Sequence, residues 1–202
     1  MRKIGIMGGT FDPIHIGHLM LAEWAAGAAG LDETWIVPTG ISYQKAGRNV
    51  LPGQERLRMA ELAVEGNEKF RCLDVEVSRE GYTYSYETLE QLRLSFPDCT
   101  FYFIMGADCL YSMERWKYPE KIFQNAILLA AARGDVSMDR LRDKRQELLQ
   151  RYGGEIQLLP FLPLPISSSI IRERIQNGLS VRYMVPDKVL SYIEEKRWYL
   201  DT

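Results

Sequence analysis

The N-terminal segment reads Lys3-Ile4-Gly5-Ile6-Met7-Gly8-Gly9-Thr10-Phe11-Asp12-Pro13-Ile14-His15-Ile16-Gly17-His18-Leu19. Its apolar start predicts a strand, and the run that continues to Ala29 predicts a helix. The two glycines of the intervening turn bring bare backbone N–H groups and a helix N-terminus to one point. Such a point suits an anion, for example a phosphate group.

Apolar runs alternate with amphipathic stretches along the 202 residues. Strands separated by helices imply parallel pairing through right-handed crossovers. We therefore predict an α/β fold with an open, doubly wound, mainly parallel sheet, in a single domain over residues 1–202 whose closing helices begin after about residue 160. Ligands bind such sheets beyond the carboxyl ends of the strands, where the winding reverses, so the turn over residues 8–18 is the natural crevice. The predicted strands are Lys3 to Met7, Thr34 to Val37, Phe70 to Val77, Thr100 to Met105, Ala126 to Ala131 and Ile156 to Leu159, and the predicted helices are Gly17 to Ala29, Gln54 to Val64, Tyr86 to Ser95, Met138 to Tyr152, Ser168 to Gln176 and Asp187 to Lys196.

The charge balance limits which partners bulk electrostatics can hold. The chain has 25 Lys and Arg against 27 Asp and Glu, a formal charge of -2. Proteins that bind nucleic acid usually present a strongly basic surface, so we expect no nucleic-acid partner. No run approaches the roughly 18 apolar residues of a membrane span, and the start is too short and glycine-rich for a signal peptide. Cys72, Cys99 and Cys109 lack metal-ligand spacing, so we expect reduced, buried thiols and a cytoplasmic protein.

His15 and His18 are the only histidines, and both lie in the first turn. Glycine-rich turns are common structural features, and this one lacks the G-x-G-x-x-G spacing of dinucleotide-binding turns. Three residues apart at a helix start, however, the two rings can lie on one side of the first turn. Near a polyphosphate the imidazolium form is favoured, and it would stabilise transferring phosphoryl oxygens.

Two further segments carry polar groups that suit a nucleotide. Ser167-Ser168-Ser169 can supply the N-cap of the following helix, or can form a second anion cradle with Arg172, and local sequence favours neither. Asp108 follows the strand that ends before Gly106, where its carboxylate can cap the next helix or hold a ribose hydroxyl. Trp116 and the tyrosines of residues 82–86 can pack in the core or stack on a planar ring.

Together these segments resemble one family. Gly8 to His18 is similar to the nucleotidyltransferase signature with an H-x-G-H core, and Ile166 to Arg172 is similar to its late partner, I-S-S-T-x-x-R. The resemblance narrows to the bacterial nicotinate mononucleotide adenylyltransferases, covers essentially the whole chain and implies a Rossmann-like nucleotidyltransferase fold. The chain departs from the family where Ser42-Tyr43-Gln44 precede Lys45 in place of two prolines and a histidine. Ser85, Glu87 and Ser169 also stand where threonine, aspartate and threonine are usual.

The resemblance implies transfer of AMP from ATP to nicotinate mononucleotide, giving nicotinate adenine dinucleotide and pyrophosphate. Mg²⁺ would be bound mainly through the ATP phosphates, with no metal site on the protein. The attacking phosphate has a second pKa of about 6 and is already ionised near neutrality, so positioning and charge stabilisation should dominate over base catalysis. The resemblance implies His15, His18, Lys45 and Arg172 as catalytic residues, Gly8, Gly9, Thr10, Phe11, Gly106, Asp108, Ser167, Ser168 and Ser169 as ATP-binding residues, and Ser85 and Trp116 as mononucleotide-binding residues.

Alternatives to this function stay open. The acceptor could be nicotinamide mononucleotide or phosphopantetheine, although phosphopantetheine enzymes resemble only the first part of the chain. Aminoacyl-tRNA synthetases share an H-I-G-H element, but this chain has no K-M-S-K-S motif and no room for a tRNA-binding body. A non-catalytic nucleotide-sensing module would have little need of His15, His18, Lys45 and Arg172 together. A homo-oligomer is possible, and no membrane partner is expected.

Overall fold

The computed structural model describes residues 1–42, 49–131, 138–162 and 164–200. The strands are β1 (Arg2–Gly9), β2 (Glu33–Pro38), β3 (Ile41–Ser42), β4 (Phe70–Cys72), β5 (Tyr82–Thr83), β6 (Cys99–Gly106), β7 (Ile127–Ala131) and β8 (Ile156–Leu159). The helices are α1 (Ile16–Ala29), α2 (Gly53–Val64), α3 (Ser85–Ser95), α4 (Ala107–Ser112), the 3-10 helix η2 (Met113–Arg115), α5 (Pro119–Asn125), α6 (Met138–Tyr152), α7 (Ser168–Gln176) and α8 (Asp187–Lys196).

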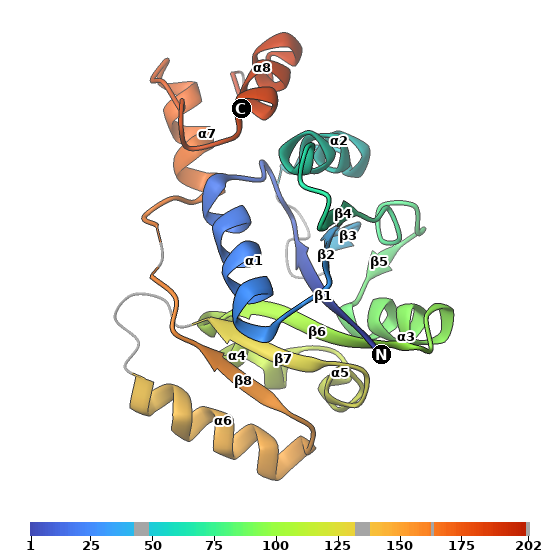
Figure 1. The fold of residues 1–202 in the computed structure, drawn as a ribbon. Coiled ribbons are helices and arrows are strands. Elements are labelled where there is room, and N and C mark those ends of the chain that lie inside the picture. The colour runs from blue at the N-terminus through green and yellow to red at the C-terminus, as the bar shows by residue number, and fades with distance from the viewer. Residues whose placement is uncertain (43–48, 132–137, 163, 201–202) are drawn as a thin grey trace.

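Six strands form one parallel sheet in the order β4-β2-β1-β6-β7-β8 (Figure 1). Numbered along the chain, this is the 3-2-1-4-5-6 order of a doubly wound Rossmann-like sheet. The winding reverses between β1 and β6, so a crevice opens beyond the carboxyl ends of these two central strands. The predicted fold class is confirmed.

Helices cover both faces of the sheet (Figure 1). One hydrophobic cluster joins the sheet to α1, α2, α7 and α8, and a second joins it to α3, α4, α5 and α6. Alternate residues of β6 supply the two clusters: Tyr102 and Ile104 belong to the first, and Phe101 and Phe103 to the second. This period of two in a strand buried on both faces explains why its sequence is continuously apolar.

One predicted strand is wrong in its second half. The alternating apolar residues of Phe70 to Val77 mimic a strand, but β4 ends at Cys72. Beyond it the chain turns: the backbone N–H of Ser78 donates to the Asp74 carbonyl at 2.9 Å, and the Ser78 hydroxyl donates to the Asp74 carboxylate at 2.9 Å. Such local side-chain bonds compete with a sheet ladder, particularly at a sheet edge.

The other predicted elements agree with the structure within two residues at each end. The elements that the sequence analysis did not predict are β3, β5, α4, η2 and α5, none longer than seven residues and therefore too short to show a period. The cysteine prediction is only partly correct: all three thiols are free, and Cys99 is buried, but Cys72 and Cys109 are half-buried. Cys72 ends the edge strand β4, and Cys109 lies on α4 beside a cavity described below.

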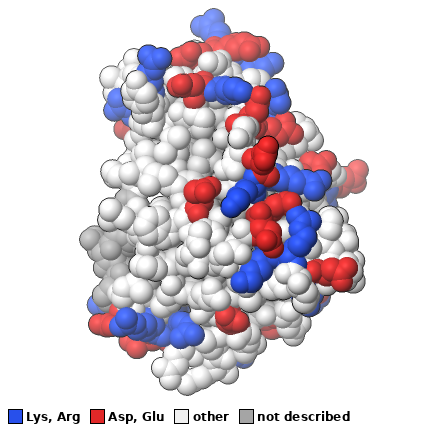
Figure 2. All heavy atoms as spheres, viewed as in Figure 1, with Lys and Arg blue, Asp and Glu red and all other residues white. Residues whose placement is uncertain are grey.

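Charged side chains of both signs are interspersed on the face shown in Figure 2. The part of this face over α1 is mostly uncharged, in keeping with a helix in which Glu23 is the one residue among Asp, Glu, Lys and Arg. Lys144 illustrates the mixing, because its ammonium pairs with Glu114 at 2.6 Å and with Glu147 at 2.9 Å. Within the described ranges, no helix is long and apolar enough to cross a bilayer.

Gly40 follows β2 and lies against the main chain of another segment. A Cβ at this position would overlap the carbonyl oxygen of Glu76 and would lie 2.7 Å from Cγ2 of Thr83. We expect Gly40→Ala to lower the free energy of unfolding by about 1–3 kcal/mol, the usual cost of overpacking. The matched control is Gly27→Ala on the exposed face of α1, where nothing lies within 4 Å.

The control should raise the free energy of unfolding by about 0.5–1 kcal/mol, because alanine is the better helix former. Urea unfolding followed by circular dichroism measures both variants. Equal stability of Gly40→Ala and the parent chain would contradict this close packing.

Candidate active site

The turn between β1 and α1 lies where the sheet winding reverses. Its conformation depends on Gly9 and Phe11: Phe11 has a left-handed backbone with φ of 51°, and its buried ring lies so close to Gly9 that a Cβ there would be 2.7 Å from it. His15 then takes an extended backbone as the N-cap of α1. The turn therefore presents its backbone and both histidines beyond the ends of the central strands.

The two histidine rings lie on one side of the first turn, as the sequence predicts, and the structure further shows that they stack on each other. Their centroids are 3.6 Å apart with an interplanar angle of 23°, and Phe11 meets His18 edge-on at 5.0 Å. The backbone N–H of His15 donates to Nδ1 of His18 at 3.3 Å. Because Nδ1 accepts this bond, the hydrogen of neutral His18 lies on Nε2. His18 is thus oriented as an N–H donor even without a positive charge.

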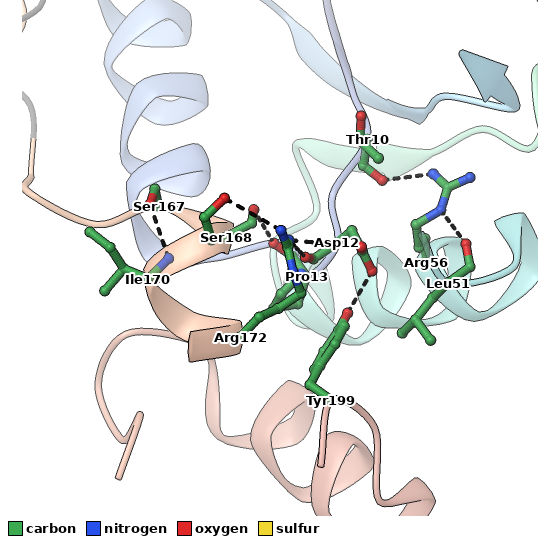
Figure 3. A network of polar contacts seen from close by, with 11 residues as sticks. Thr10, Asp12, Pro13, Leu51, Arg56, Ser167, Ser168, Ile170, Arg172 and Tyr199 are labelled. Carbon is green, nitrogen blue, oxygen red and sulfur yellow. Dashed lines mark hydrogen bonds and ion pairs between the residues drawn. The ribbon is translucent and has the colours of Figure 1, made fainter. Parts of the chain in front are cut away.

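The serine motif packs directly on this turn (Figure 3). Ser167 is the N-cap of α7, since its hydroxyl accepts from the backbone N–H of Ile170 at 3.2 Å. The Ser168 hydroxyl donates to the carbonyl of Pro13 at 2.9 Å, and Arg172 donates through Nη1 to the carbonyl of Asp12 at 2.6 Å. The N-cap interpretation is correct for Ser167, and two segments far apart in sequence form one wall.

Two cavities meet at the turn. The first, of about 300 Å³, lies between the turn and α7; the second, of about 380 Å³, lies between β1, α3 and α4. Thr10 and His18 line both. Of the predicted site residues, Phe11, His15, Ser167, Ser168, Ser169 and Arg172 also line the first cavity, and Gly8, Gly9, Ser85, Asp108 and Trp116 also line the second.

The remaining predicted site residues are Gly106 and Lys45. Gly106 is the buried N-cap of α4, and it lines neither of the two cavities. Lys45 lies outside the described residues, as do Tyr43 and Gln44 of the unusual loop. Asp108, in contrast, is not a helix cap: it lies within the first turn of α4, with its side chain exposed along the second cavity.

A buried polar network that was not predicted from the sequence lies behind the turn (Figure 3). Asp12 is 4% exposed, and Oδ1 of its carboxylate accepts a hydrogen bond of 2.7 Å from the Tyr199 hydroxyl. Arg56, 3% exposed, donates to three main-chain carbonyls, those of Thr10 at 2.7 Å, Leu51 at 2.8 Å and Gly40 at 3.2 Å. Burial lowers the pKa of the Arg56 guanidinium, and the nearby Asp12 carboxylate opposes this change.

Arg56 carries a signal in the sequence. It falls on the same helix face as Met59 and Ala60, both fully buried, so it is a charge in an apolar stripe. Asp12 and Tyr199 have no comparable signal, because they meet across nearly the whole length of the chain.

Glu76 is a second buried acid, in the wall of the second cavity. It is 6% exposed, and it accepts a hydrogen bond of 2.8 Å from the Thr88 hydroxyl. Burial raises the pKa of the Glu76 carboxyl, and the bond from Thr88 opposes this rise. The predicted ring-stacking residue, Trp116, is held in the same wall by a bond from its Nε1 to the Ser112 hydroxyl at 3.3 Å.

Comparisons with known proteins show the family of this chain. Residues 6–174 match the cytidylyltransferase-like family model. The chain is 42% identical over 200 residues to the "Probable nicotinate-nucleotide adenylyltransferase" of Lachnoclostridium phytofermentans, covering 99% of this chain and all of the relative. It is 40% identical over 199 residues to the protein of the same name in Geobacillus thermodenitrificans, covering 98% and 87%.

Solved structures show the same fold. The nicotinic acid mononucleotide adenylyltransferase of Plasmodium falciparum complexed with NaAD superposes with a TM-score of 0.81 at 21% identity, over 98% of both chains. The fold alone does not identify the family. The two relatives named above do, because they are 40% and 42% identical to this chain over nearly its full length. The chain belongs to the nicotinate-nucleotide adenylyltransferase family, within the cytidylyltransferase-like proteins.

Proposed function

We propose that this chain transfers AMP from ATP to nicotinate mononucleotide, releasing pyrophosphate and forming nicotinate adenine dinucleotide. One observation carries the proposal: two cavities share Thr10 and His18, the first lined by serine hydroxyls, the histidine pair and Arg172, and the second by polar groups together with Tyr84, Phe103 and Trp116. Two nucleotides bound in them would bring their phosphates together at His18. Membership in the adenylyltransferase family supports the same reaction.

ATP occupies the first cavity in this proposal. Its triphosphate lies between the histidine pair and the wall formed by Ser167 to Ser169 and Arg172, and Lys45 is a further predicted contact. Backbone groups of Gly8 to Phe11 contact the nucleotides. His18, whose Nδ1 is occupied by the His15 N–H, offers its Nε2 hydrogen to the reacting α-phosphate. Asp108, in the first turn of α4 and in the wall of the second cavity, holds a ribose hydroxyl.

The reaction needs compensation for negative charge more than it needs a base. An ionised phosphate monoester attacks an anionic triphosphate, and pyrophosphate leaves with further charge. Donors fixed in advance around the reacting phosphate stabilise the transition state without reorganising. The stacked histidines and the Ser168 and Arg172 bonds to the turn supply this rigidity.

Mg²⁺ is the cofactor in this proposal. It keeps several waters and takes few protein ligands when phosphate oxygens are available. The hydroxyls of Ser167 and Ser169 line the first cavity and suit water-mediated contacts with such an ion. Across the described ranges, no group of three or more His, Cys, Asp or Glu could hold a metal by itself. When bound, Mg²⁺ would neutralise part of the polyphosphate charge.

Several broader features belong to the same proposal. A single domain over residues 1–202 is supported by α7 and α8, which pack into the same hydrophobic cluster as α1. A homo-oligomer, a cytoplasmic location and the lack of a nucleic-acid partner stay predictions.

The proposed reaction is tested by measuring pyrophosphate release with ATP, Mg²⁺ and either nicotinate or nicotinamide mononucleotide. We expect kcat/KM to be higher with the nicotinate form when the two acceptors are compared in parallel. Inactivity with both would refute adenylyl transfer to a pyridine mononucleotide and leave a phosphopantetheine acceptor or a nucleotide-sensing module. Comparable kcat/KM values would refute only the acid preference.

His18→Ala should lower kcat by about 10²–10³-fold, the usual effect of removing one fixed donor to a transition state. Glu23→Gln, an exposed change on the same helix, serves as the control and should leave kcat unchanged. Steady-state kinetics on both variants, with unfolding midpoints to confirm folding, decide the point. A variant His18→Ala with near-normal kcat/KM would remove His18 from the reaction.

Lys117 gives a physical reason for the nicotinate preference. Its ammonium lies 4.1 Å from the ring centroid of Tyr84, along the second cavity, and among the described residues no carboxylate pairs with it. A pyridine carboxylate would be attracted to this charge, whereas a neutral amide would not. The neighbouring Lys121 is instead paired with Glu90 at 2.9 Å and does not line the cavity.

We therefore expect Lys117→Met to reduce the kcat/KM ratio of nicotinate over nicotinamide mononucleotide by about threefold to fivefold, the effect of one exposed charge. Lys121→Met is the matched control and should leave the ratio unchanged. The same ratio in parent and Lys117→Met proteins would show that backbone contacts alone select the acid.

A further inference from the structure

Asp12 lies between Tyr199 and Arg172, and its carboxylate interacts differently with each of them (Figure 3). The Tyr199 hydroxyl donates to Oδ1 at 2.7 Å, whereas Nη1 of Arg172 is 3.8 Å from Oδ2. Arg172 uses that same nitrogen to donate to the main-chain carbonyl of Asp12 at 2.6 Å. The arginine is thus anchored to Asp12 through its backbone, and its contact with the carboxylate is too long for a hydrogen bond.

This arrangement matters because Arg172 lines the first cavity. A guanidinium in a full, bidentate pair with a carboxylate has two of its donors and much of its charge occupied. Oδ2 of Asp12 is already 3.8 Å from Nη1 of Arg172, so a carboxylate released from Tyr199 would be free to close this gap. A phosphate entering the cavity would then compete with Asp12 for Arg172.

Tyr199 is suited to prevent this competition. Both Tyr199 and Asp12 are 4% exposed, so the buried carboxylate needs a donor, and a hydroxyl bond to an ionised group is a strong one. Burial, and then the adjacent Asp12 charge, raise the pKa of Tyr199 above its usual range. The hydroxyl therefore keeps its proton at any working pH. Arg56 and Arg172 are the cationic groups that face this pair.

We propose that Tyr199 is a positioning residue, whose hydroxyl holds the Asp12 carboxylate off Arg172 and so leaves the guanidinium available to the phosphates of the nucleotide. The proposal rests on the proposed function only in naming that nucleotide as ATP. A purely structural tyrosine would instead tether its segment to the turn, and its loss would weaken ATP binding equally with or without a charge on residue 12.

The first test compares ATP binding, without any mononucleotide, by isothermal titration calorimetry. Tyr199→Phe keeps the buried ring and should raise the Kd for ATP by about 5- to 30-fold, the range expected when one charge-assisted contact to phosphate is lost. Tyr192→Phe is the matched control, because it removes a similar tyrosine bond to a carboxylate, that of Glu55 at 2.6 Å, away from Arg172. The control should bind ATP like the parent protein.

The second test removes the competing charge. In the Asp12→Asn background there is no carboxylate to capture Arg172, so adding Tyr199→Phe should change the Kd for ATP by less than about twofold. A structural tether would still be lost in this background. This pair of variants also remains decisive if Tyr199→Phe alone does not fold, because the asparagine amide carries no buried charge that needs a donor.

Steady-state kinetics supply a third readout: Tyr199→Phe should raise the KM for ATP and leave the KM for the mononucleotide unchanged. The proposal is overturned if Tyr199→Phe binds ATP like the parent, if the loss is equally large in the Asp12→Asn background, or if the parent protein does not bind ATP. Failure of the proposed function is seen separately, as ATP binding without pyrophosphate release.

Discussion

The structure depends on how the turn after β1 is held. Beyond Gly9 the turn leaves the sheet ladder, and the contacts that fix it come from the C-terminal segment: Ser168 on Pro13, Arg172 on Asp12, Tyr199 on Asp12, and the backbone N–H of Ile16 on the carbonyl of Met184. Arg56 holds it from the other side through the carbonyl of Thr10. The site therefore forms only when the N-terminal turn and the C-terminal segment of the described chain are in contact.

These contacts also explain why the site is rigid around the position proposed for the negatively charged phosphates. His15 and His18 are fixed by stacking and by one backbone bond, and the wall opposite them is fixed by hydrogen bonds that α7 makes to the turn. Polar groups that are already oriented stabilise developing charge at little cost in reorganisation. A site of this kind needs few residues that contact the substrates, because segments distant in the sequence hold those residues in position.

Features that depend on residues close together in the sequence could be predicted from it, whereas contacts between residues far apart in the sequence could not. The spacing of apolar residues indicates the long helices and the buried strands, so the parallel fold could be predicted. The glycines and histidines of the first turn indicate where the crevice lies. The Phe70 to Val77 segment misled because Asp74 and Ser78 pair locally despite an alternating pattern. The contact between Asp12 and Tyr199 cannot be predicted from any repeating pattern in the sequence. The roles given to individual site residues came from a family resemblance, and all of them, including that of Lys45, stay predictions.

The meeting of the two cavities at Thr10 and His18 has a consequence for the end of the reaction cycle. Two substrates that bind separately each lose translational and rotational freedom, whereas one molecule that spans both cavities loses it once. In the proposed reaction the dinucleotide product would be such a molecule, and only the contacts to the released pyrophosphate would be lost. Departure of the product, rather than formation of its phosphate bridge, would then be the slow step.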